Sequence, residues 1–267
     1  MMIKEALRNI RSERNGVVYP GEAGRFKDFE EEYLEVRQKE GRVFDDDLVR
    51  KLPWLPDGHP LKIEWLYRAD TLDRFSRYLV KRKGVSSLLD LGCGNGWFIN
   101  KLSALIHDTE LVGLDVNRIE LEQAARLFPG NNKTFAYGDI FHDIFQPGSF
   151  DIITLNSTIQ YFPDAGMLIE RLLALLKENG EIHILDSPLY KTNEEKDAAF
   201  KRSELYFSKI NSKGMTGHYH HHTFDFLKSY RYKVLYKPDR LKNRLFTLIG
   251  GKRSPFHWIR IRRMTSR

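Results

Sequence analysis

Cysteine is nearly absent from this chain of 267 residues, which has one, at position 93. A single cysteine excludes an internal disulfide framework and fits a reducing compartment. No apolar run approaches the roughly 20 residues that a membrane-spanning helix needs. Charges also interrupt the N-terminal stretch, where a secretory signal would need an apolar core. We therefore expect a soluble, cytoplasmic protein.

Acidic residues are missing from the last part of the chain. From Arg240 onward there are nine basic residues and no acidic one, so the net charge of +7 leaves −2 for the rest of the protein. A basic tail of this kind is usually a solvated strand face and a chain end. The alternative is contact with an anionic partner such as RNA, phospholipid or an acidic substrate.

The most informative stretch that is present spans residues 88–98, Leu-Leu-Asp-Leu-Gly-Cys-Gly-Asn-Gly-Trp-Phe. An apolar run ends in glycines at 92, 94 and 96, and apolar residues then recur at helical spacing from Phe98 to Ile106. The pattern predicts a strand, a tight turn and a helix, which is where an open α/β sheet binds a ligand. Glycine lets the backbone approach that ligand or adopt a positive φ, and the helix start offers free N–H groups.

The spacing of the glycines distinguishes between nucleotide-like ligands. A dinucleotide-binding turn has the form GxGxxG, but here the third glycine comes one residue early and Trp97 takes its place. The GxGxG turn, with Asp90 two residues before it, resembles the first motif of class I S-adenosylmethionine-dependent methyltransferases. A pyridine-nucleotide dehydrogenase and a purely structural turn remain as alternatives. The resemblance covers residues 85–262 and implies cofactor contacts from Asp90, Gly92, Cys93, Gly94 and Gly96. Cys93 itself, between two turn glycines, reads as a packing residue rather than a nucleophile.

The remaining pattern predicts an α/β fold. Strands are expected at 86–91, 110–115, 133–138, 149–156, 180–186, 232–237 and 255–262, with helices between them at 96–107, 118–128, 164–177, 193–210 and 223–230. These strands resemble the seven-stranded, Rossmann-like methyltransferase sheet, mostly parallel with one antiparallel strand. Residues 1–83 carry helical patterns and no strand pattern. We expect an N-terminal helical extension or lid at 1–83 and the S-adenosylmethionine-binding domain at 84–267.

Further cofactor contacts follow from the ends of later strands. Asp115 ends the second strand, where an acid can accept hydrogen bonds from both ribose hydroxyls, and Val116 follows it. By the resemblance, Asp139 hydrogen-bonds the adenine amino group and Ile140 packs on the ring. The helical extension often folds over the cofactor in this family, which offers Tyr33 and Arg68, and also Tyr19 and Arg37, to the methionine carboxylate.

The end of the fourth strand, Asn156-Ser157-Thr-Ile-Gln-Tyr-Phe, points to the acceptor class. It lacks the (Asn/Asp)-Pro-Pro-aromatic motif of enzymes that methylate exocyclic amino groups of nucleic-acid bases, and Asn156 argues against bound Mg²⁺. It resembles the ubiquinone-biosynthesis-like, small-molecule branch. That resemblance places Asn156 and Ser157 at the methionine end of the cofactor. Asp186-Ser-Pro-Leu looks like the nucleic-acid motif but follows the fifth strand, so we discount it.

Four histidines fall within residues 218–222. Adjacent side chains diverge and no cysteine joins them, so we expect no metal site. His220, His221 and Tyr161 are candidates for deprotonating or orienting an acceptor, because the usual pKa of histidine lies near neutrality; a histidine-rich surface loop is the alternative. We expect in-line methyl transfer from S-adenosylmethionine to a small molecule, which leaves S-adenosylhomocysteine. The alternatives are an RNA or protein methyltransferase that uses the basic tail, and a non-catalytic regulator that binds the cofactor.

Overall fold

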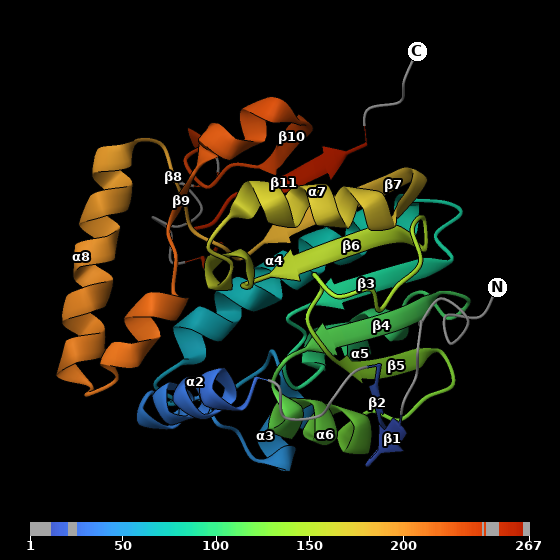
Figure 1. The fold of residues 1–267 in the computed structure, drawn as a ribbon, viewed down its shortest axis with the longest axis horizontal. Coiled ribbons are helices and arrows are strands. Elements are labelled where there is room, and N and C mark those ends of the chain that lie inside the picture. The colour runs from blue at the N-terminus through green and yellow to red at the C-terminus, as the bar shows by residue number, and fades with distance from the viewer. Residues whose placement is uncertain (1–11, 21–25, 242, 244–250, 264–267) are drawn as a thin grey trace.

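A mixed sheet forms the centre of the computed structural model, which describes residues 12–20, 26–241, 243 and 251–263. Among these residues its strand order is β1-β2-β5-β4-β3-β6-β7-β11-β10 (Figure 1). The strands are β1 (Ser12–Arg14), β2 (Val17–Tyr19), β3 (Ser87–Leu91), β4 (Glu110–Asp115), β5 (Lys133–Tyr137), β6 (Phe150–Asn156), β7 (Leu176–Leu185), β10 (Arg231–Tyr236) and β11 (Trp258–Arg262). All strands from β2 to β7 in this order run parallel, and β11 is antiparallel to both β7 and β10. A strand lies at each of the seven predicted positions, and β11 of the last pair is antiparallel, but the prediction of a single antiparallel strand is wrong, because β1 is a second one.

The N-terminal region corrects the prediction in one respect. Residues 12–19 form a β-hairpin, and its second strand adds to the sheet beside β5, so the described sheet has nine strands rather than seven. The turn between the strands is Asn15-Gly16, with φ of +50° and +76°. Paired positive φ values of this kind are typical of the tight hairpin turn that Asn-Gly favours. Val17, Val18 and Tyr19 are buried, because β2 completes the hydrophobic surface next to β5.

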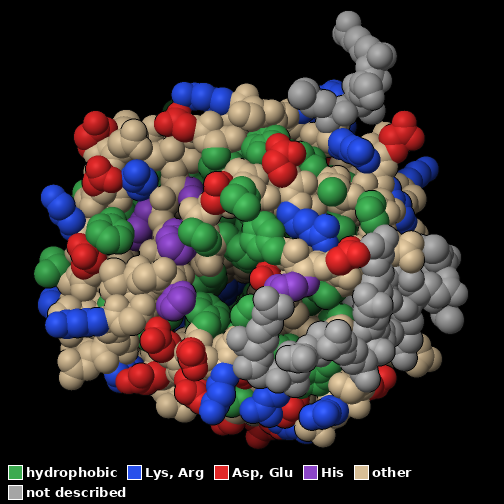
Figure 2. Space-filling model, viewed as in Figure 1, with side chains coloured by type: hydrophobic (Ala, Val, Ile, Leu, Met, Phe, Trp, Pro, Cys, Tyr) green, Lys and Arg blue, Asp and Glu red, His purple; other side chains and the backbone are tan. Residues whose placement is uncertain are grey.

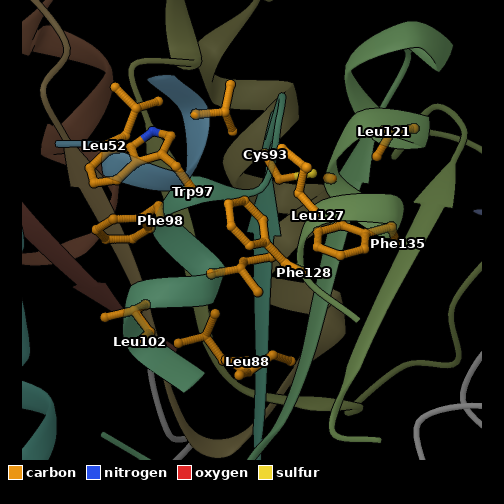
Figure 3. Packing of buried hydrophobic residues seen from close by; sticks show 14 of the residues in the cluster. Leu52, Leu88, Cys93, Trp97, Phe98, Leu102, Leu121, Leu127, Phe128 and Phe135 are labelled. Carbon is orange, nitrogen blue, oxygen red and sulfur yellow. The ribbon is translucent and has the colours of Figure 1, made fainter. Parts of the chain in front are cut away.

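Helices cover both faces of the sheet (Figure 1). On one face lie α4 (Lys62–Lys81), α5 (Trp97–Ser103) and α6 (Arg118–Leu127), whose apolar side chains pack on alternate strand residues such as Leu88 and Leu111. Figure 3 shows Trp97, Phe98 and Leu102 of α5 in this cluster beside Cys93. On the other face, α7 (Ala165–Leu175) packs against the residues between them, including Leu89 and Val112. Strand residues that alternate between two cores are the expected consequence of a sheet buried on both sides.

A third, smaller cluster joins elements outside these two layers. Val36 of α2 (Lys27–Lys39), Phe207 of α8 (Asn193–Lys209) and Met215 of the 3₁₀ helix η2 (Lys213–His218) pack together with Tyr161, which ends the 3₁₀ helix η1 (Ile159–Tyr161) after β6. These elements therefore meet at the carboxyl end of the parallel strands. Two short strands, β8 (Leu189–Tyr190) and β9 (His222–Thr223), form a separate parallel pair. A short helix, α3 (Asp46–Lys51), follows α2. The helix predicted at 223–230 is the 3₁₀ helix η3 (Phe224–Ser229).

Three of the basic C-terminal residues form ion pairs within the fold. Arg253 forms an ion pair with Asp70 of α4, while Arg260 and Arg262 of β11 reach Glu181 of β7. Lys242, Arg244 and Arg267 of the predicted tail lie outside the described residues. Within the described part of the chain, no helix combines the length and apolar character needed to cross a membrane.

Candidate functional site

The glycine turn after β3 has the geometry that its sequence predicts. Gly92, Gly94 and Gly96 have φ of +73°, +51° and +72°, a region that favours residues without a Cβ. The Gly92 N–H donates to the Leu114 carbonyl oxygen at 2.8 Å, which ties the turn to β4. A Cβ on Gly92 would lie 2.5 Å from the Thr158 side chain, and one on Gly94 would lie 3.1 Å from the Glu120 carboxylate. The backbone of the turn therefore lies close to the Thr158 and Glu120 side chains, and a Cβ at either glycine would crowd them.

A cavity of about 560 Å³ opens beside this turn. Its size falls within the range of small-molecule and cofactor sites. Its walls come from the glycine turn, from the carboxyl ends of β6 and β7, from α4, and from the covering elements α2, α8 and η2. The predicted residues among its lining are Tyr33, Arg37, Arg68, Asp90, Gly92, Cys93, Gly94, Asn156, Ser157 and Tyr161.

Other predicted residues are not part of that lining: Tyr19, Gly96, Asp115, Val116, Asp139, Ile140, His220 and His221. Ile140 is buried in the core on the α7 face, and the Asp139 carboxylate accepts the Phe141 N–H at 3.0 Å. Tyr19 packs against Tyr137. Gly96 begins α5 and faces Ala124 and Phe135 rather than the cavity. The proposed adenine contacts of Asp139 and Ile140 remain predictions.

Asp115 lies directly behind the glycine turn. Its carboxylate accepts the Gly94 N–H at 2.8 Å and the Asn117 N–H at 2.9 Å, and also interacts with the Val116 N–H. Burial raises the pKa of Asp115, while these backbone hydrogen bonds act in the opposite direction. The residue thus fixes the turn against the start of α6, and its predicted contact with the ribose remains a prediction.

Asp90 is a buried carboxyl group in the cavity wall. The Thr154 hydroxyl donates to it at 2.6 Å. Burial raises the pKa of Asp90 to about 7, against the effect of the Thr154 hydrogen bond, and the Asp115 charge adds to the increase. Burial also raises the pKa of the Cys93 thiol. A protonated, buried thiol is not a nucleophile, so the structure supports the expectation that Cys93 is a packing residue.

Three arginines line the cavity: Arg37 of α2, Arg42 in the loop after α2, and Arg68 of α4. Arg42 makes a bidentate contact with Glu64 at 2.6 and 2.7 Å, and Arg68 donates to the same carboxylate at 3.0 Å. Burial would raise the pKa of Glu64, but these arginines lower it to about 2. The Nε atoms of Arg37 and Arg68 are buried without a hydrogen-bond partner. Buried donors of this kind normally find a partner, so a bound anionic group would complete the site.

The histidine-rich segment is fixed mainly by contacts within the protein. The His221 ring lies 3.1 Å from the Ser203 hydroxyl and 3.2 Å from the Tyr190 hydroxyl, and the His222 ring lies 3.0 Å from the Phe162 carbonyl oxygen. Burial lowers the pKa of His221 to about 4. Figure 2 shows histidine side chains beside hydrophobic ones on the face in view. No group of metal-ligating side chains occurs among the described residues. A base role for His220 or His221 remains a prediction without a cavity contact to support it.

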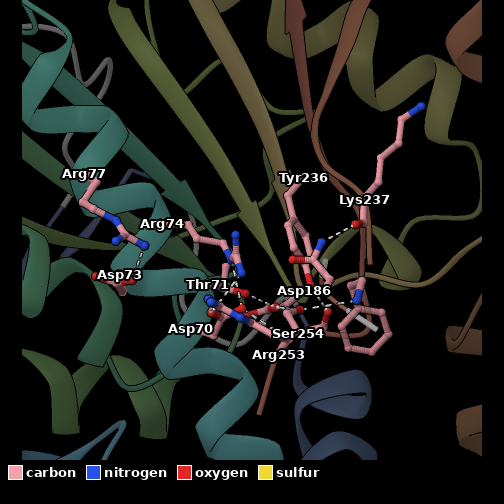
Figure 4. A network of polar contacts seen from close by, with 12 residues as sticks. Asp70, Thr71, Asp73, Arg74, Arg77, Asp186, Tyr236, Lys237, Arg253 and Ser254 are labelled. Atoms are coloured by element: carbon pink, nitrogen blue, oxygen red, sulfur yellow. Dashed lines mark hydrogen bonds and ion pairs between the residues drawn. The ribbon is translucent and has the colours of Figure 1, made fainter. Parts of the chain in front are cut away.

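Asp186 is a cavity residue that the sequence analysis discounted. It follows β7 with φ of +44°, beside Ser157, which follows β6 with φ of +60°. Figure 4 shows its side chain between Thr71 and Ser254, whose hydroxyls donate to Oδ1 at 2.6 and 3.0 Å. Its other oxygen, Oδ2, is buried without a hydrogen-bond partner. Non-glycine residues held in this strained backbone region often mark functional sites, and two adjacent strands supply one each.

Comparison with known proteins identifies the family. The pattern of the family described as "Methyltransferase domain" matches residues 83–235. The chain belongs to this methyltransferase family. It is 25% identical over 218 residues to a demethylmenaquinone methyltransferase of Lactobacillus johnsonii, a match that covers 68% of this chain and 88% of the relative. A malonyl-[acyl-carrier protein] O-methyltransferase of Legionella pneumophila is 32% identical over 94 residues, or 35% of this chain and 33% of the relative.

Two solved methyltransferases share the fold. The magnesium protoporphyrin IX methyltransferase of Synechocystis with bound S-adenosylhomocysteine has a TM-score of 0.55, 14% identity, and coverage of 89% of this chain and 100% of that one. A plantazolicin methyltransferase in complex with a pentazolic desmethylPZN analogue and S-adenosylhomocysteine has a TM-score of 0.51 and 17% identity, and the match covers 91% of this chain and 100% of that one.

The cofactor of this methyltransferase is S-adenosylmethionine, with S-adenosylhomocysteine as the product. The residues present fit that group. The positive-φ glycines leave backbone open where a Cβ would collide. The unpartnered polar atoms on the cavity wall include both donors and acceptors: Arg37 Nε, Arg68 Nε, Asn156 Oδ1 and Gln160 Oε1. Such a mixture suits a ligand that carries both an ammonium and a carboxylate.

Proposed function

We propose that this methyltransferase acts on a small-molecule acceptor that is enclosed between the sheet edge and the covering helices. The observation that carries the proposal is the roof of the cavity. Tyr33, Tyr161, Phe207, Met215 and Tyr219 line it, and several of these rings stack edge to face. An apolar, aromatic wall favours a compact or ring-bearing acceptor over a polymer chain. The relative named as a demethylmenaquinone methyltransferase supports an acceptor of that kind.

The division of labour follows from the chemistry of the cofactor. S-adenosylmethionine supplies an electrophilic methyl group, so the protein has to position the acceptor in line with it. The Arg68 guanidinium is suited to hold the methionine carboxylate. Asn156 and Ser157 border the cavity at the end of β6, and Tyr33 and Tyr161 line the side formed by the covering elements. The Asp186 carboxylate, with its unpartnered oxygen, is better placed than His220 or His221 to take a proton from a hydroxyl or amine acceptor.

The basic-tail alternative has less support. Arg253, Arg260 and Arg262 already have carboxylate partners inside the fold, so they offer less free charge to a phosphate backbone. An RNA-binding enzyme would show an affinity for RNA that falls steeply with salt.

Radiolabelled methyl transfer tests the proposal. The protein is incubated with tritiated S-adenosylmethionine and separate panels of quinols and phenols, small carboxylic acids, small amines, transfer RNA and a protein extract. We expect label to enter a small molecule with an apolar ring. Label that enters only RNA or protein would contradict the proposal, and binding of the cofactor without transfer to any panel would favour the regulatory alternative.

A further inference from the structure

Glu120 has the sequence position of a helix-capping residue but does not act as one. It lies three residues after Asn117 at the start of α6, where its side chain would normally return to the Asn117 N–H. That N–H instead donates to Asp115 at 2.9 Å. The Arg118 and Ile119 N–H groups donate to Glu30 of α2 at 2.7 and 3.3 Å. The carboxylates of Asp115 and Glu30 therefore accept the first N–H groups of α6, and the Glu120 side chain is not needed to cap the helix.

The released carboxylate lines the cavity beside the glycine turn. Its Oε2 lies 3.1 Å from the position that a Cβ on Gly94 would occupy. The N–H of the same glycine donates to Asp115, so two carboxylates flank Gly94. No hydrogen bond to the Glu120 oxygens is found among the described residues. Its nearest ionic partner is Arg37 of α2, at 3.8 Å.

Asp115 alone has little capacity left for a sugar. A carboxylate offers about four lone-pair positions, and backbone N–H groups of Gly94, Asn117 and Val116 already use three of those on Asp115. A ribose presents two hydroxyl donors. Asp115 can therefore accept only one of the two ribose hydroxyls, and the second hydroxyl needs another acceptor. Glu120 lies beside the same glycine, and neither of its oxygens accepts a hydrogen bond from the described residues.

We propose that Glu120 is a second sugar-binding carboxylate of the cofactor site, which accepts a hydrogen bond from a ribose hydroxyl while Asp115 accepts the other. Arg37 provides the counter-charge from the covering helix α2. The proposal rests on the cofactor and not on the identity of the acceptor, so it stands or falls separately from the proposed function.

The charged and titratable groups around Glu120 predict how pH affects this contact. Burial raises the pKa of Glu120 to about 7, Arg37 opposes that shift, and Asp115 adds to it. Tyr33, Tyr161 and the Cys93 thiol also face it, and they stay neutral near pH 7 because burial raises the pKa of each. The ionised carboxylate is the better acceptor, so binding of the sugar should strengthen as pH rises through 7.

Calorimetry with S-adenosylhomocysteine and its 2′-deoxy and 3′-deoxy analogues tests the proposal. We expect Glu120→Gln to weaken binding of S-adenosylhomocysteine about 10- to 100-fold, the usual worth of a hydrogen bond to a charged group. One deoxy analogue should bind the wild type as weakly as it binds Glu120→Gln, because the contact is missing in both cases. The matched control is Glu122→Gln on the same helix, whose carboxylate pairs with Arg118, and it should bind like the wild type.

The wild type alone supplies a second readout. Its affinity for S-adenosylhomocysteine should be about tenfold higher at pH 8 than at pH 6, and the analogue that lacks the relevant hydroxyl should lose that dependence. The pKa of Asp90 is also about 7. The three ligands differ only in a ribose hydroxyl, so we expect the titration of Asp90 to change their affinities by the same factor, which cancels when they are compared. Unchanged binding by Glu120→Gln, or equal pH dependence for all three ligands, would overturn the proposal.

Discussion

At the scale of single residues, the three glycines of the turn have different surroundings: two face the cavity and one faces the core. Gly92 and Gly94 line the cavity, whereas Gly96 faces Ala124 and Phe135. The sequence motif does not distinguish the three glycines. Only the packing around each one shows whether it faces the cavity or the core. A substitution at Gly96 should therefore affect stability, and one at Gly94 should affect the cofactor.

The variant Gly96→Ala tests this division. Its φ is +72°, and the added Cβ would lie 2.8 Å from both the Ala124 Cβ and the Phe135 ring. We expect the free energy of unfolding to fall by about 2–4 kcal/mol, the sum of left-handed strain and overpacking. Urea unfolding measures this loss. Gly41→Ala is the control, since its φ is +65° with nothing within 4 Å, and it should cost only about 1–2 kcal/mol. Weaker cofactor binding by folded Gly96→Ala would argue against the division.

The unpartnered oxygen of Asp186 gives a second prediction at this scale. Asp186→Asn keeps the shape of the side chain but removes its ability to take a proton. If the acceptor carries a proton on its nucleophile, we expect kcat to fall about 10²- to 10³-fold, while calorimetry finds S-adenosylhomocysteine binding unchanged. Asp239→Asn, at an exposed pair with Lys191, is the control. An unchanged kcat for Asp186→Asn would remove Asp186 from the chemistry.

At the scale of elements, long buried strands were predictable and short ones were not. The seven predicted strands have five to ten residues, enough to show either an apolar run, as in β3, or an alternation of apolar and polar residues, as in β11. Their positions therefore follow from the sequence. The β1–β2 hairpin was missed because each strand has three residues, too few to show a period. The Asn15-Gly16 pair before Val17 was the available signal. It lies in a region whose other patterns are helical, so the sequence alone favours helix there.

The cavity was predictable only in part, for a similar reason. The glycine turn, Asn156 and Ser157 follow strands that the sequence reveals. The Arg42–Glu64 pair and the free oxygen of Asp186 depend on how α4 and residue Ser254 approach the sheet, and no local pattern encodes that approach.

The ionic contacts of Glu181 join three elements and predict a stability effect. This buried carboxylate on β7 interacts with Tyr78 of α4, with Arg260 and Arg262 of β11, and with His183. We expect Glu181→Gln to lower the free energy of unfolding by about 2–4 kcal/mol, because it removes the buried charge that pairs with the partly exposed Arg260 and Arg262. Glu178→Gln, exposed on the same strand, should have little effect. Equal stability of the two variants would contradict this account.

The same network predicts how stability changes with pH. Burial would raise the pKa of Glu181, but hydrogen bonds from His183, Tyr78 and Arg262 outweigh it and hold the pKa well below its usual range. A carboxyl group with a depressed folded pKa stabilises the protein above its unfolded pKa of about 4.3, and this contribution is lost as pH falls below that value. Thermal unfolding between pH 3 and 7 should therefore show a steeper acid loss for the wild type than for Glu181→Gln.

At the scale of the whole molecule, the C-terminal strand is an interior part of the sheet. β11 lies between β7 and β10 and buries Trp258, Ile259 and Ile261. We expect removal of residues 251–267 to abolish cooperative unfolding, as followed by circular dichroism. The milder variant Ile259→Ala should cost about 2–5 kcal/mol. A truncated protein that stays folded and has lost an affinity for RNA would instead support the basic-tail alternative.

The pairing of β2 with β5 also sets an order of events during synthesis. Val17 and Val18 leave the ribosome early, yet their parallel partners Phe135 and Ala136 are translated much later. Until then the nascent hairpin has no neighbour to bury its apolar side chains, and parallel pairing over such a span forms slowly. The β1–β2 hairpin, although it is made early, therefore cannot join the sheet until about half of the protein has been translated.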